Sequence, residues 1–425
     1  MATIFAEAPV APKVSSRRGV FQVIRRLGWG VVDQGISSLS NVALGLYVAR
    51  SFGASSFGAF ALAFVTYTVV INASRGLGTD PLLVRHSGDV HRRWRRATSA
   101  ATATALLVGV AAGAVCVVVG LLLSDPLGSV FVALGVGLPG LTFQDSWRFA
   151  FFARGRGSSA FVNDLIWTVL LVLALVALDS RGDGSAARCL LAFGLTATLA
   201  GVLGAVQASI IPRLTGVAGW LRAHRQLSVR YLAENVSISG ASQLRSIVLG
   251  AVAGLAAVGY VRASEILMGP FLVVLLGISQ ASVPEASRVF HRNPRNLGRF
   301  CFMLGGAQAA AAVAWGLILM TVFRLGPGPV LLGELWVPTA QLLPAITITL
   351  AAASFVTAAT AGLRAMGLAH RSLRAQLIGS TAYAIGGIGG AVLGGAIGTS
   401  WGVAIAVCFS AVVWWHQLRS ALVDH

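Results

Sequence analysis

The sequence predicts an all-α polytopic membrane protein, and three observations support that fold class. Hydrophobic residues make up 56% of the 425-residue chain and charged residues only 11%, a composition unlike that of soluble proteins. The apolar residues gather into about twelve stretches of roughly 17–25 residues, each long enough to cross a hydrocarbon layer of about 30 Å as a helix. Basic residues crowd into every second connection between these stretches.

The predicted spans follow one another with short connections, so no extramembrane domain is expected. The spans cover residues 28–50, 57–74, 97–123, 130–153, 162–178, 187–210, 229–250, 258–282, 300–323, 338–363, 375–397 and 401–418. The residues before the first span contain no apolar core followed by a small-residue cleavage site. A retained tail is therefore expected rather than a cleaved signal peptide.

The distribution of positive charge predicts the orientation in the membrane. Of the 32 Lys and Arg residues, twenty-six lie on the side of the chain ends and only four on the opposite connections. Because basic residues concentrate in cytoplasmic loops, both termini are predicted to be cytoplasmic. The net charge of +18 is spread over seven segments, so anionic membrane lipids are the expected contacts and nucleic acid is not. The excess of Arg over Lys, with much Ala and Gly, is typical of a GC-rich bacterial genome, and a bacterial plasma membrane is expected.

The two halves of the chain resemble each other when the sequence is shifted by 201 residues. The shift aligns Asp33 with Glu234, Ser38 with Ser239, Gly53 with Gly254 and Gly58 with Gly259. Six spans per half give both halves the same orientation. A parallel repeat about an axis along the membrane normal is therefore predicted, which in transporters places the substrate site between the halves. The predicted parts are a cytoplasmic tail at 1–27, a six-helix bundle at 28–210, a cytoplasmic linker at 211–228, a second six-helix bundle at 229–418 and a tail at 419–425.

Polar side chains recur at helical spacing within three spans. The stripes consist of Asp33, Ser37, Ser40 and Asn41 in the first span, Thr68, Asn72 and Arg75 in the second, and Glu234, Ser242 and Arg245 in the seventh. An ionisable group at the membrane centre costs about 3 kcal/mol or more, so it usually faces a cavity or a partner. The stripes predict a water-filled cavity, with hydrogen bonding between neighbouring helices as the alternative.

Two pairs of opposite charge lie three residues apart on single helices, Asp145 with Arg148 and Arg262 with Glu265. Such pairs either neutralise each other or hold an arginine ready for an anion. A guanidinium group suits a phosphate because it stays charged and donates two parallel hydrogen bonds. Asp164 lies near the cytoplasmic end of its span and receives no predicted role.

The densest basic run covers residues 91–96, with the sequence HRRWRR. An interfacial anchor is the main interpretation of this run, and a site for a lipid pyrophosphate is the alternative. Just before it, Arg75 and Arg85 flank the segment 76–81, which is predicted to break the second helix. An irregular segment at that depth should line a cavity or be buried by protein.

Prolines and glycines indicate where helices bend or approach each other. Bends are predicted at Pro139, Pro270, Pro338 and Pro344. Glycines at 386, 390, 394 and 398 form a ladder of small residues assigned to the eleventh span, which predicts close helix contact.

The sequence contains no signature of a cofactor or of direct ATP hydrolysis. The four cysteines lie in apolar spans at unrelated spacings, so neither disulfides nor a metal site are predicted. No nucleotide-binding glycine loop or catalytic serine motif appears in an exposed segment. We therefore expect no enzyme and no cofactor, with coupling to a proton or sodium gradient as the open alternative.

The segment from Asp33 to Ser74 resembles the opening of bacterial polysaccharide flippases, including the O-antigen type. These flippases belong to the multidrug/oligosaccharidyl-lipid/polysaccharide exporter (MOP) superfamily. The resemblance lies in the runs DQG at 33–35, YVARSFG at 47–53, FGAFAL at 57–62, RGLG at 75–78 and LLVR at 82–85. Twelve spans with short loops match this family along the whole chain.

The resemblance implies two six-helix bundles around a V-shaped cleft, and transfer of a polyprenyl-(pyro)phosphate-linked sugar from the inner to the outer leaflet by alternating access. It assigns lipid-phosphate binding to the arginines Arg75, Arg85, Arg245 and Arg262. It assigns ion coupling to Asp33, Asp145 and Glu234, with Asn41 and Asn72 as polar cavity residues. The implied partners are the lipid-linked sugar, membrane lipids and enzymes of polysaccharide assembly, and a monomer is expected.

Two alternatives stay open. An ion-coupled drug or cation antiporter of the same superfamily would need an acidic cavity, whereas several arginines lie in or beside the spans here. A non-transporting scaffold for polysaccharide enzymes would tolerate loss of the charges in the cavity.

Overall fold

The computed structural model of the chain describes residues 40–86 and 90–423, which are helical throughout apart from short turns. Eight helices or groups of helices in this part are long and apolar enough to cross a membrane. The predicted all-α polytopic fold is confirmed. Large apolar side chains cover the outer faces of the helices, as expected of surfaces in contact with lipid; Leu173 and Val176, for example, are each 60% exposed.

The described part of the first half starts within a helix that continues to residue 51. The elements that follow are α2 (Gly53–Ser74), a π-helical turn (Arg75–Thr79), α3 (Asp80–His86), α4 (His91–Leu122), α5 (Leu127–Ala153), α6 (Gly157–Ser180) and α7 (Ala186–Ala208). Helix α5 packs against α4 and α7, and α7 against α6. Aromatic residues fill the contact between these helices, where Phe193 lies 4.9 Å from Trp167 and 5.6 Å from Tyr67 between ring centres.

The predicted linker is folded into short helices, and the second half follows it. The elements are a 3-10 turn (Leu214–Gly216), α8 (Val217–Ala223), α9 (Arg225–Ala253), α10 (Leu255–Leu267), α11 (Gly269–Arg292), α12 (Leu297–Thr321), α13 (Pro327–Leu332), α14 (Trp336–Ala365) and α15 (Ala369–Val423). Single 3-10 turns at Pro294–Asn296, Phe323–Leu325 and Gly333–Leu335 connect neighbouring helices. Helix α14 packs against α12 and α15, and α15 also packs against α9.

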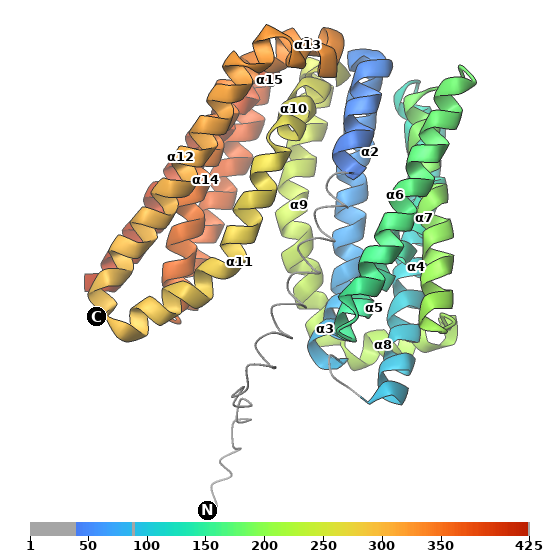
Figure 1. Ribbon diagram of the computed structural model, residues 1–425, viewed down its shortest axis with the longest axis horizontal. Helices are drawn as coiled ribbons and strands as arrows, with labels where there is room; N and C mark the ends of the chain where they lie inside the picture. Colours follow the sequence, from blue (N-terminus) through green and yellow to red (C-terminus); the bar gives the residue numbers. More distant parts are fainter. Residues whose placement is uncertain (1–39, 87–89, 424–425) are drawn as a thin grey trace, which may run out of the picture.

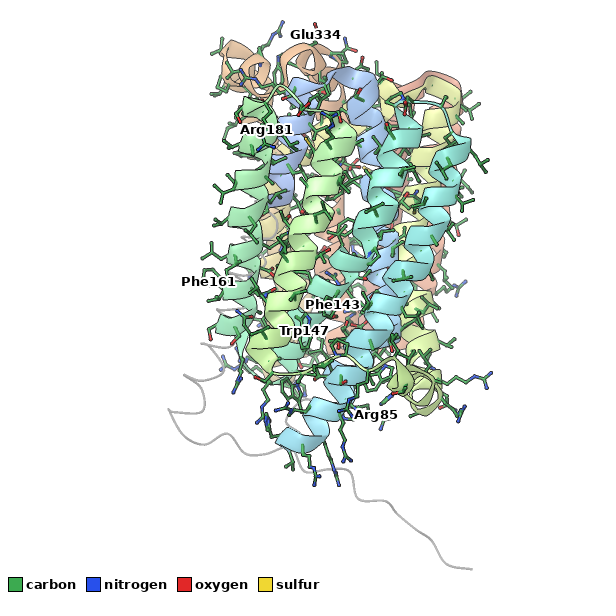
Figure 2. All side chains as sticks on the ribbon, turned by 90° about the vertical axis from the view of Figure 1, so that its right-hand side faces the viewer. Arg85, Phe143, Trp147, Phe161, Arg181 and Glu334 are labelled. Atoms are coloured by element: carbon green, nitrogen blue, oxygen red, sulfur yellow. The ribbon has the colours of Figure 1, made fainter. Side chains whose placement is uncertain are left out.

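Figure 1 shows α4 to α7 on one side of the molecule and α11, α12, α14 and α15 on the other, with α2, α9 and α10 between them. The two groups diverge toward the end that holds α3 and α8, which we call the basic end. Figure 2 places Arg85 at this basic end and Glu334 at the opposite end. The helices between the groups meet through contacts of α2 with α9 and α10.

The eighth predicted span is two helices. Helix α10 ends at Leu267, and α11 begins at Gly269 with Pro270 in its first turn. Proline lacks the N–H group that a continuous helix needs at this position. The predicted bend at Pro270 is therefore confirmed, and it places the break beside the cavity described below.

The predicted break at residues 76–81 is wrong. The chain stays helical from α2 to His86 and only widens into the π-helical turn that begins at Arg75. The glycines serve close packing instead, since a side chain at Gly76 would collide with the backbone of Leu232 on α9. Single π-turns of this kind often mark functional sites.

The glycine ladder at the end of the chain spans two helices, not one as predicted. The chain reverses at Gly394 and Gly395, and Gly395 has a φ of 56°, which glycine adopts without strain. The two arms then pack backbone to backbone, with Gly386 against Gly402 and Gly390 against Gly398. The predicted close helix contact is thus present, but it lies between the last two spans.

Reciprocal glycine contacts support the predicted repeat. A Cβ at Gly58 would collide with the carbonyl oxygen of Leu255, and a Cβ at Gly259 would lie 2.9 Å from the carbonyl oxygen of Ala54. The shift of 201 residues aligns Gly58 with Gly259 and Ala54 with Leu255, so the two contacts are equivalent under the repeat. The aligned residues Gly53 and Gly254 both have positive φ, at 74° and 83°. A parallel repeat around a two-fold axis produces such pairs of contacts.

We predict that Gly58→Val separates α2 from α10, because a side chain there overlaps the α10 backbone and such overpacking costs about 1–3 kcal/mol or more. The readout is a disulfide cross-link between Thr66→Cys and Gln243→Cys, whose native side chains hydrogen-bond at 2.8 Å between α2 and α9. In a protein whose four native cysteines are replaced, Gly58→Val should slow the formation of this cross-link about ten-fold.

The control is Gly240→Val on α9, because no atom lies within 4 Å of a Cβ at that position. Equal cross-linking in the Gly58 and Gly240 variants would contradict the close contact of α2 with α10.

Candidate functional site

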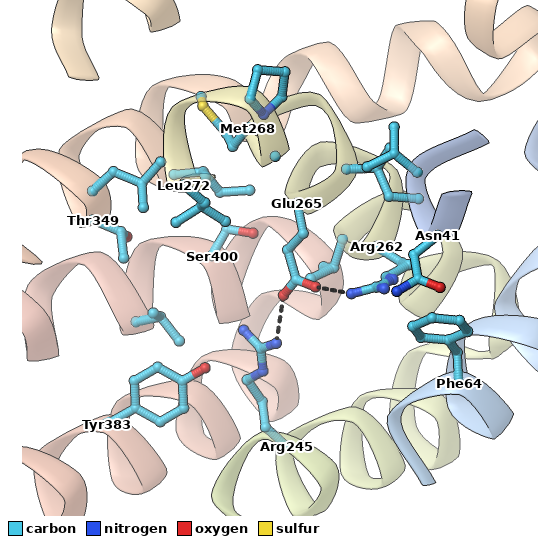
Figure 3. Close-up of a pocket in the computed structure, with 18 residues that line it drawn as sticks. Asn41, Phe64, Arg245, Arg262, Glu265, Met268, Leu272, Thr349, Tyr383 and Ser400 are labelled. Carbon is cyan, nitrogen blue, oxygen red and sulfur yellow. Dashed lines mark hydrogen bonds and ion pairs between the residues drawn. The ribbon is translucent and has the colours of Figure 1, made fainter. Parts of the chain in front are cut away.

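A cavity of about 650 Å³ lies where the bend between α10 and α11 faces α9, α14 and α15. The helix at 40–51 and α2 complete its wall from the first half of the chain. Most of the lining is apolar, including Val42, Ile266, Met268, Leu272 and Leu350. The cavity is therefore an apolar chamber into which a few polar groups project (Figure 3).

Three charged side chains form the polar centre of this cavity. Glu265 on α10 accepts hydrogen bonds from Arg245 of α9 at 2.9 Å and from Arg262, one helical turn away, at 3.3 Å. The side chain of Arg245 is only 8% exposed. Because two arginines share one carboxylate, the cluster keeps one net positive charge (Figure 3).

Aromatic rings fix the far sides of both guanidinium groups. The Cζ atom of Arg245 lies 5.7 Å from the ring centre of Tyr383 on α15. That of Arg262 lies 4.9 Å from the ring centre of Phe64 on α2. Contacts of a cation with a ring face add about 0.5–2 kcal/mol and leave N–H groups free to donate. The second contact also joins the two halves of the chain through the cavity wall.

Two atoms in this wall are buried without a hydrogen-bond partner, the Nε atom of Arg262 and the Oδ1 atom of Asn41. Buried polar atoms are normally satisfied, so both atoms have hydrogen-bonding capacity that the protein does not use. With Thr349 and Ser400 nearby, the cavity offers cationic donors and neutral polar groups on an apolar background. This combination fits a ligand with an anionic group, hydroxyl groups and an apolar part.

A second group of charges, buried or half-buried, lies in the first half, where two arginines meet carboxylates on neighbouring helices. Arg75, at the π-helical turn, donates two hydrogen bonds to Asp145 of α5, at 2.7 and 2.9 Å. Arg148 of α5 lies 3.7 Å from Asp164 of α6, which also accepts a 2.6 Å hydrogen bond from Gln144. Unlike the cavity, each of these two pairs carries no net charge.

The structure corrects one of the two predicted pairs on single helices. Arg262 and Glu265 form the predicted pair. Asp145 and Arg148 do not pair with each other, because each meets a residue of opposite charge on a neighbouring helix. Asp164, which received no predicted role, is 1% exposed and belongs to this buried network.

The predicted site residues are distributed over several places. Arg245, Arg262 and Asn41 line the cavity, whereas Arg75 and Asp145 belong to the neutral pairs. Arg85 is exposed on α3 at the basic end and does not reach the cavity. The backbone carbonyl of Asn72 accepts a hydrogen bond from Asn235 where α2 meets α9. Asp33 and the side chain of Glu234 lie outside the described residues.

The sequence did not reveal Tyr383 as a residue of the cavity, and it revealed only part of the role of Glu265. Glu265 was identified as a partner for Arg262, but not as the carboxylate that a second helix shares. Tyr383 lies more than a hundred residues from both arginines and gave no local signal. A lone tyrosine in a glycine-rich span is a weak hint of such a role.

Comparison of the structure with solved proteins shows the fold. One match is an inward-facing multidrug resistance MATE family transporter of the MOP superfamily, with a TM-score of 0.74 and 15% identity over 93% of this chain and 98% of that chain. An outward-facing MATE family transporter matches with a TM-score of 0.55 and 16% identity, covering 95% and 96%. The lipid II flippase MurJ, in an inward closed conformation, matches with a TM-score of 0.63 and 11% identity, covering 92% and 87%.

The sequence itself matches no protein-family model and no curated protein. The chain nevertheless has the fold of MOP-superfamily transporters, so the predicted resemblance is confirmed at the level of the fold.

We predict that Arg75→Ala lowers the apparent melting temperature far more than Arg288→Ala. Breaking a fully buried pair costs about 3–5 kcal/mol because the remaining charge is uncompensated, whereas an exposed pair contributes about 0–1 kcal/mol. The side chains of Arg75 and Asp145 are 29% and 10% exposed, so the loss should lie between these limits. Arg288 pairs with Glu285 on the surface, where the two side chains are 71% and 50% exposed. The measurement is a thermal melt of the purified protein in detergent.

The double variant Arg75→Gln with Asp145→Asn should recover at least part of the loss, because it removes both charges. A double variant that melts as low as the single one would show that packing of Arg75, not charge pairing, stabilises this region.

Proposed function

We propose that this chain is a flippase for a polyprenyl-(pyro)phosphate-linked sugar, which it moves from the inner to the outer leaflet. The observation that supports the proposal most is the net positive charge of a largely apolar cavity, set by Arg245 and Arg262 around Glu265. Guanidinium groups bind phosphate through paired hydrogen bonds. The polar groups of the same wall suit sugar hydroxyls.

The shape of the molecule supports access from the cytoplasm. The two groups of helices diverge toward the basic end, which the distribution of arginines assigns to the cytoplasmic side (Figure 1). The TM-score is also higher with the inward-facing MATE transporter than with the outward-facing one, at 0.74 against 0.55. When the molecule is open toward the basic end, the substrate enters from the inner leaflet.

In the proposed cycle, the phosphate first reaches Arg245 and Arg262 and competes with Glu265 for their N–H groups. The sugar then occupies the cavity near Asn41, Thr349 and Ser400, while the prenyl chain stays in lipid. Opening toward the outer leaflet requires α2 to part from α9 and α10. That movement separates Phe64 from Arg262, which changes the cation site while the substrate leaves.

Coupling to an ion gradient requires a carboxylate that can bind a proton or a sodium ion. Three carboxylates in the spans, Asp145, Asp164 and Glu265, lie beside arginines, so each of them already has a cationic partner. Asp33 and Glu234 are then the remaining candidates for binding a proton or sodium ion.

The fold likeness to MATE proteins keeps a drug or cation antiporter as the second candidate. An organic cation would meet a net positive charge at Arg245 and Arg262, which disfavours its binding. The charge of the cavity therefore favours the flippase over the antiporter.

The test is leaflet exchange of a fluorescent polyprenyl-pyrophosphate oligosaccharide in sealed liposomes, followed with an external quencher. Arg245→Ala and Arg262→Ala should each slow the exchange about ten-fold or more, because a charge-assisted hydrogen bond contributes about 1.5–3 kcal/mol.

Arg288→Ala is the matched control, because Arg288 and Glu285 form the same type of pair as Arg262 and Glu265 but on the surface. No exchange of any sugar lipid, together with ion-driven efflux of a cationic dye, would contradict the flippase and support the antiporter. Inactivity in both assays would favour the scaffold.

A further inference from the structure

A second hollow, separate from the cavity, lies at the basic end where α3, α4 and the junction of α8 with α9 come together. We call it the cytoplasmic groove and define it by Arg85, His86, Arg93, His224, Leu227 and Arg230. It has a volume of about 610 Å³. Its arginines come from the consecutive helices α3 and α4 and, more than a hundred residues later, from α9.

The groove has a strong positive charge. Arg85, Arg93 and Arg230 all contribute to its wall, and none of the lining residues that the structure describes is acidic. Three cations held together in one hollow repel each other unless an anion or solvent offsets their charge. The positive-inside rule explains many basic residues at this end, but not their convergence from α3, α4 and α9 on one concave site.

Three aromatic rings in tilted and edge-to-face contact lie at the base of the groove. The rings of Trp220 and His224 lie 4.0 Å apart, and His86 lies 5.6 and 5.5 Å from them. The Nδ1 atom of His224 is 3.1 Å from the carbonyl oxygen of Trp220, and because a carbonyl only accepts, Nδ1 holds the proton. Nε2 is then the ring atom that gains a proton when His224 becomes charged.

The base of the groove is attached to the π-helical turn. The Nε1 atom of Trp220 donates a 3.2 Å hydrogen bond to the carbonyl oxygen of Leu77, and Ser228 donates another at 3.4 Å. Leu77 lies two residues after Arg75, which pairs with Asp145. The groove is therefore connected through hydrogen bonds to the buried charges of the first half.

We propose that the cytoplasmic groove binds the phosphate or pyrophosphate headgroup of a lipid in the inner leaflet. The bound headgroup links Arg85 and Arg93 of the first half to Arg230 at the start of the second half. This site is distinct from the cavity and does not depend on transport. The headgroup belongs either to a bulk anionic phospholipid or to a prenyl pyrophosphate, and the test distinguishes the two.

Protonation of His224 should strengthen binding. Burial lowers the pKa of His224 below its usual value, and His86 and Arg85 act in the same direction. The empty groove thus keeps His224 neutral at pH 7, and an anion facing Arg85, Arg93, Arg230 and both histidines offsets that effect. Since a phosphodiester keeps its single charge between pH 7.5 and 5.5, its affinity should rise as the pH falls through this range.

The experiment measures binding to the purified protein through the fluorescence of its tryptophans, including Trp220. The probes are short-chain phosphatidylglycerol, farnesyl pyrophosphate and, as a zwitterionic control, short-chain phosphatidylcholine. Arg93→Ala and Arg230→Ala should each weaken binding of an anionic probe about ten-fold, through loss of charge-assisted hydrogen bonds. His224→Ala should remove most of the pH dependence for phosphatidylglycerol.

The matched control is Arg92→Ala, because Arg92 is exposed on the same helix as Arg93 but does not line the groove. Binding of phosphatidylglycerol and farnesyl pyrophosphate with similar affinity supports a bulk lipid site, and a strong preference for farnesyl pyrophosphate supports a prenyl carrier. The proposal is overturned if Arg92→Ala and Arg93→Ala weaken binding equally. It is also overturned if neither anionic probe binds saturably. All binding is measured with Arg245→Gln and Arg262→Gln in place, so that the cavity does not contribute to it and the outcome is independent of the leaflet-exchange assay.

Discussion

The carboxylate of Glu265 holds two arginines from two different helices inside an apolar wall. Buried charges persist only when they are paired, because transfer from water without a partner costs several kcal/mol per ion, of the order of 3–5 kcal/mol when one partner is removed. Glu265 therefore fixes the position of α9 against α10 as well as the charge of the cavity. Through Arg262 and Phe64 it also determines how α2 of the first half lies against the second.

The two halves share a backbone repeat but differ in charge. The reciprocal contacts at Gly58 and Gly259 give α2 and α10 equivalent positions around the two-fold axis. In the first half, Arg75 meets Asp145 and Arg148 meets Asp164, whereas in the second half two arginines share Glu265. The repeat therefore builds a symmetric frame, and at the cavity the arginines in excess over carboxylate, Arg245 and Arg262 around Glu265, come from the second half.

Much of the fold could be predicted from the sequence because a membrane requires long apolar helices and a biased distribution of arginines. What failed depends on contacts between helices. The segment after Arg75 stays helical because Gly76 lets α9 approach, and neither its glycines nor its proline reveal that neighbour. The spacing of three residues predicted a pair of Asp145 with Arg148, because a sequence shows only partners on the same helix. The actual partner of Asp145, Arg75, lies on another helix.

The candidate site was predictable in its chemistry and less so in its location. Arg245 and Arg262 were identified because charged residues inside spans are rare, and both line the cavity. Arg85 was grouped with them through the family resemblance, yet it lies at the basic end in a separate groove (Figure 2). The contribution of Tyr383 depends on the packing of α15 against α9, which no local pattern predicts.

The central claim is that the cavity selects anions. The most direct measurement compares binding of farnesyl phosphate and farnesyl amine, which differ mainly in the sign of the headgroup, in native protein and in the double variant Arg245→Gln with Arg262→Gln. Both proteins also carry Arg93→Ala, which weakens binding to the groove, so that the comparison reports on the cavity. We expect farnesyl phosphate to bind more tightly than farnesyl amine in the protein that keeps both arginines. In the double variant this preference should disappear or reverse. Tighter binding of the amine before the two arginines are replaced would contradict the account.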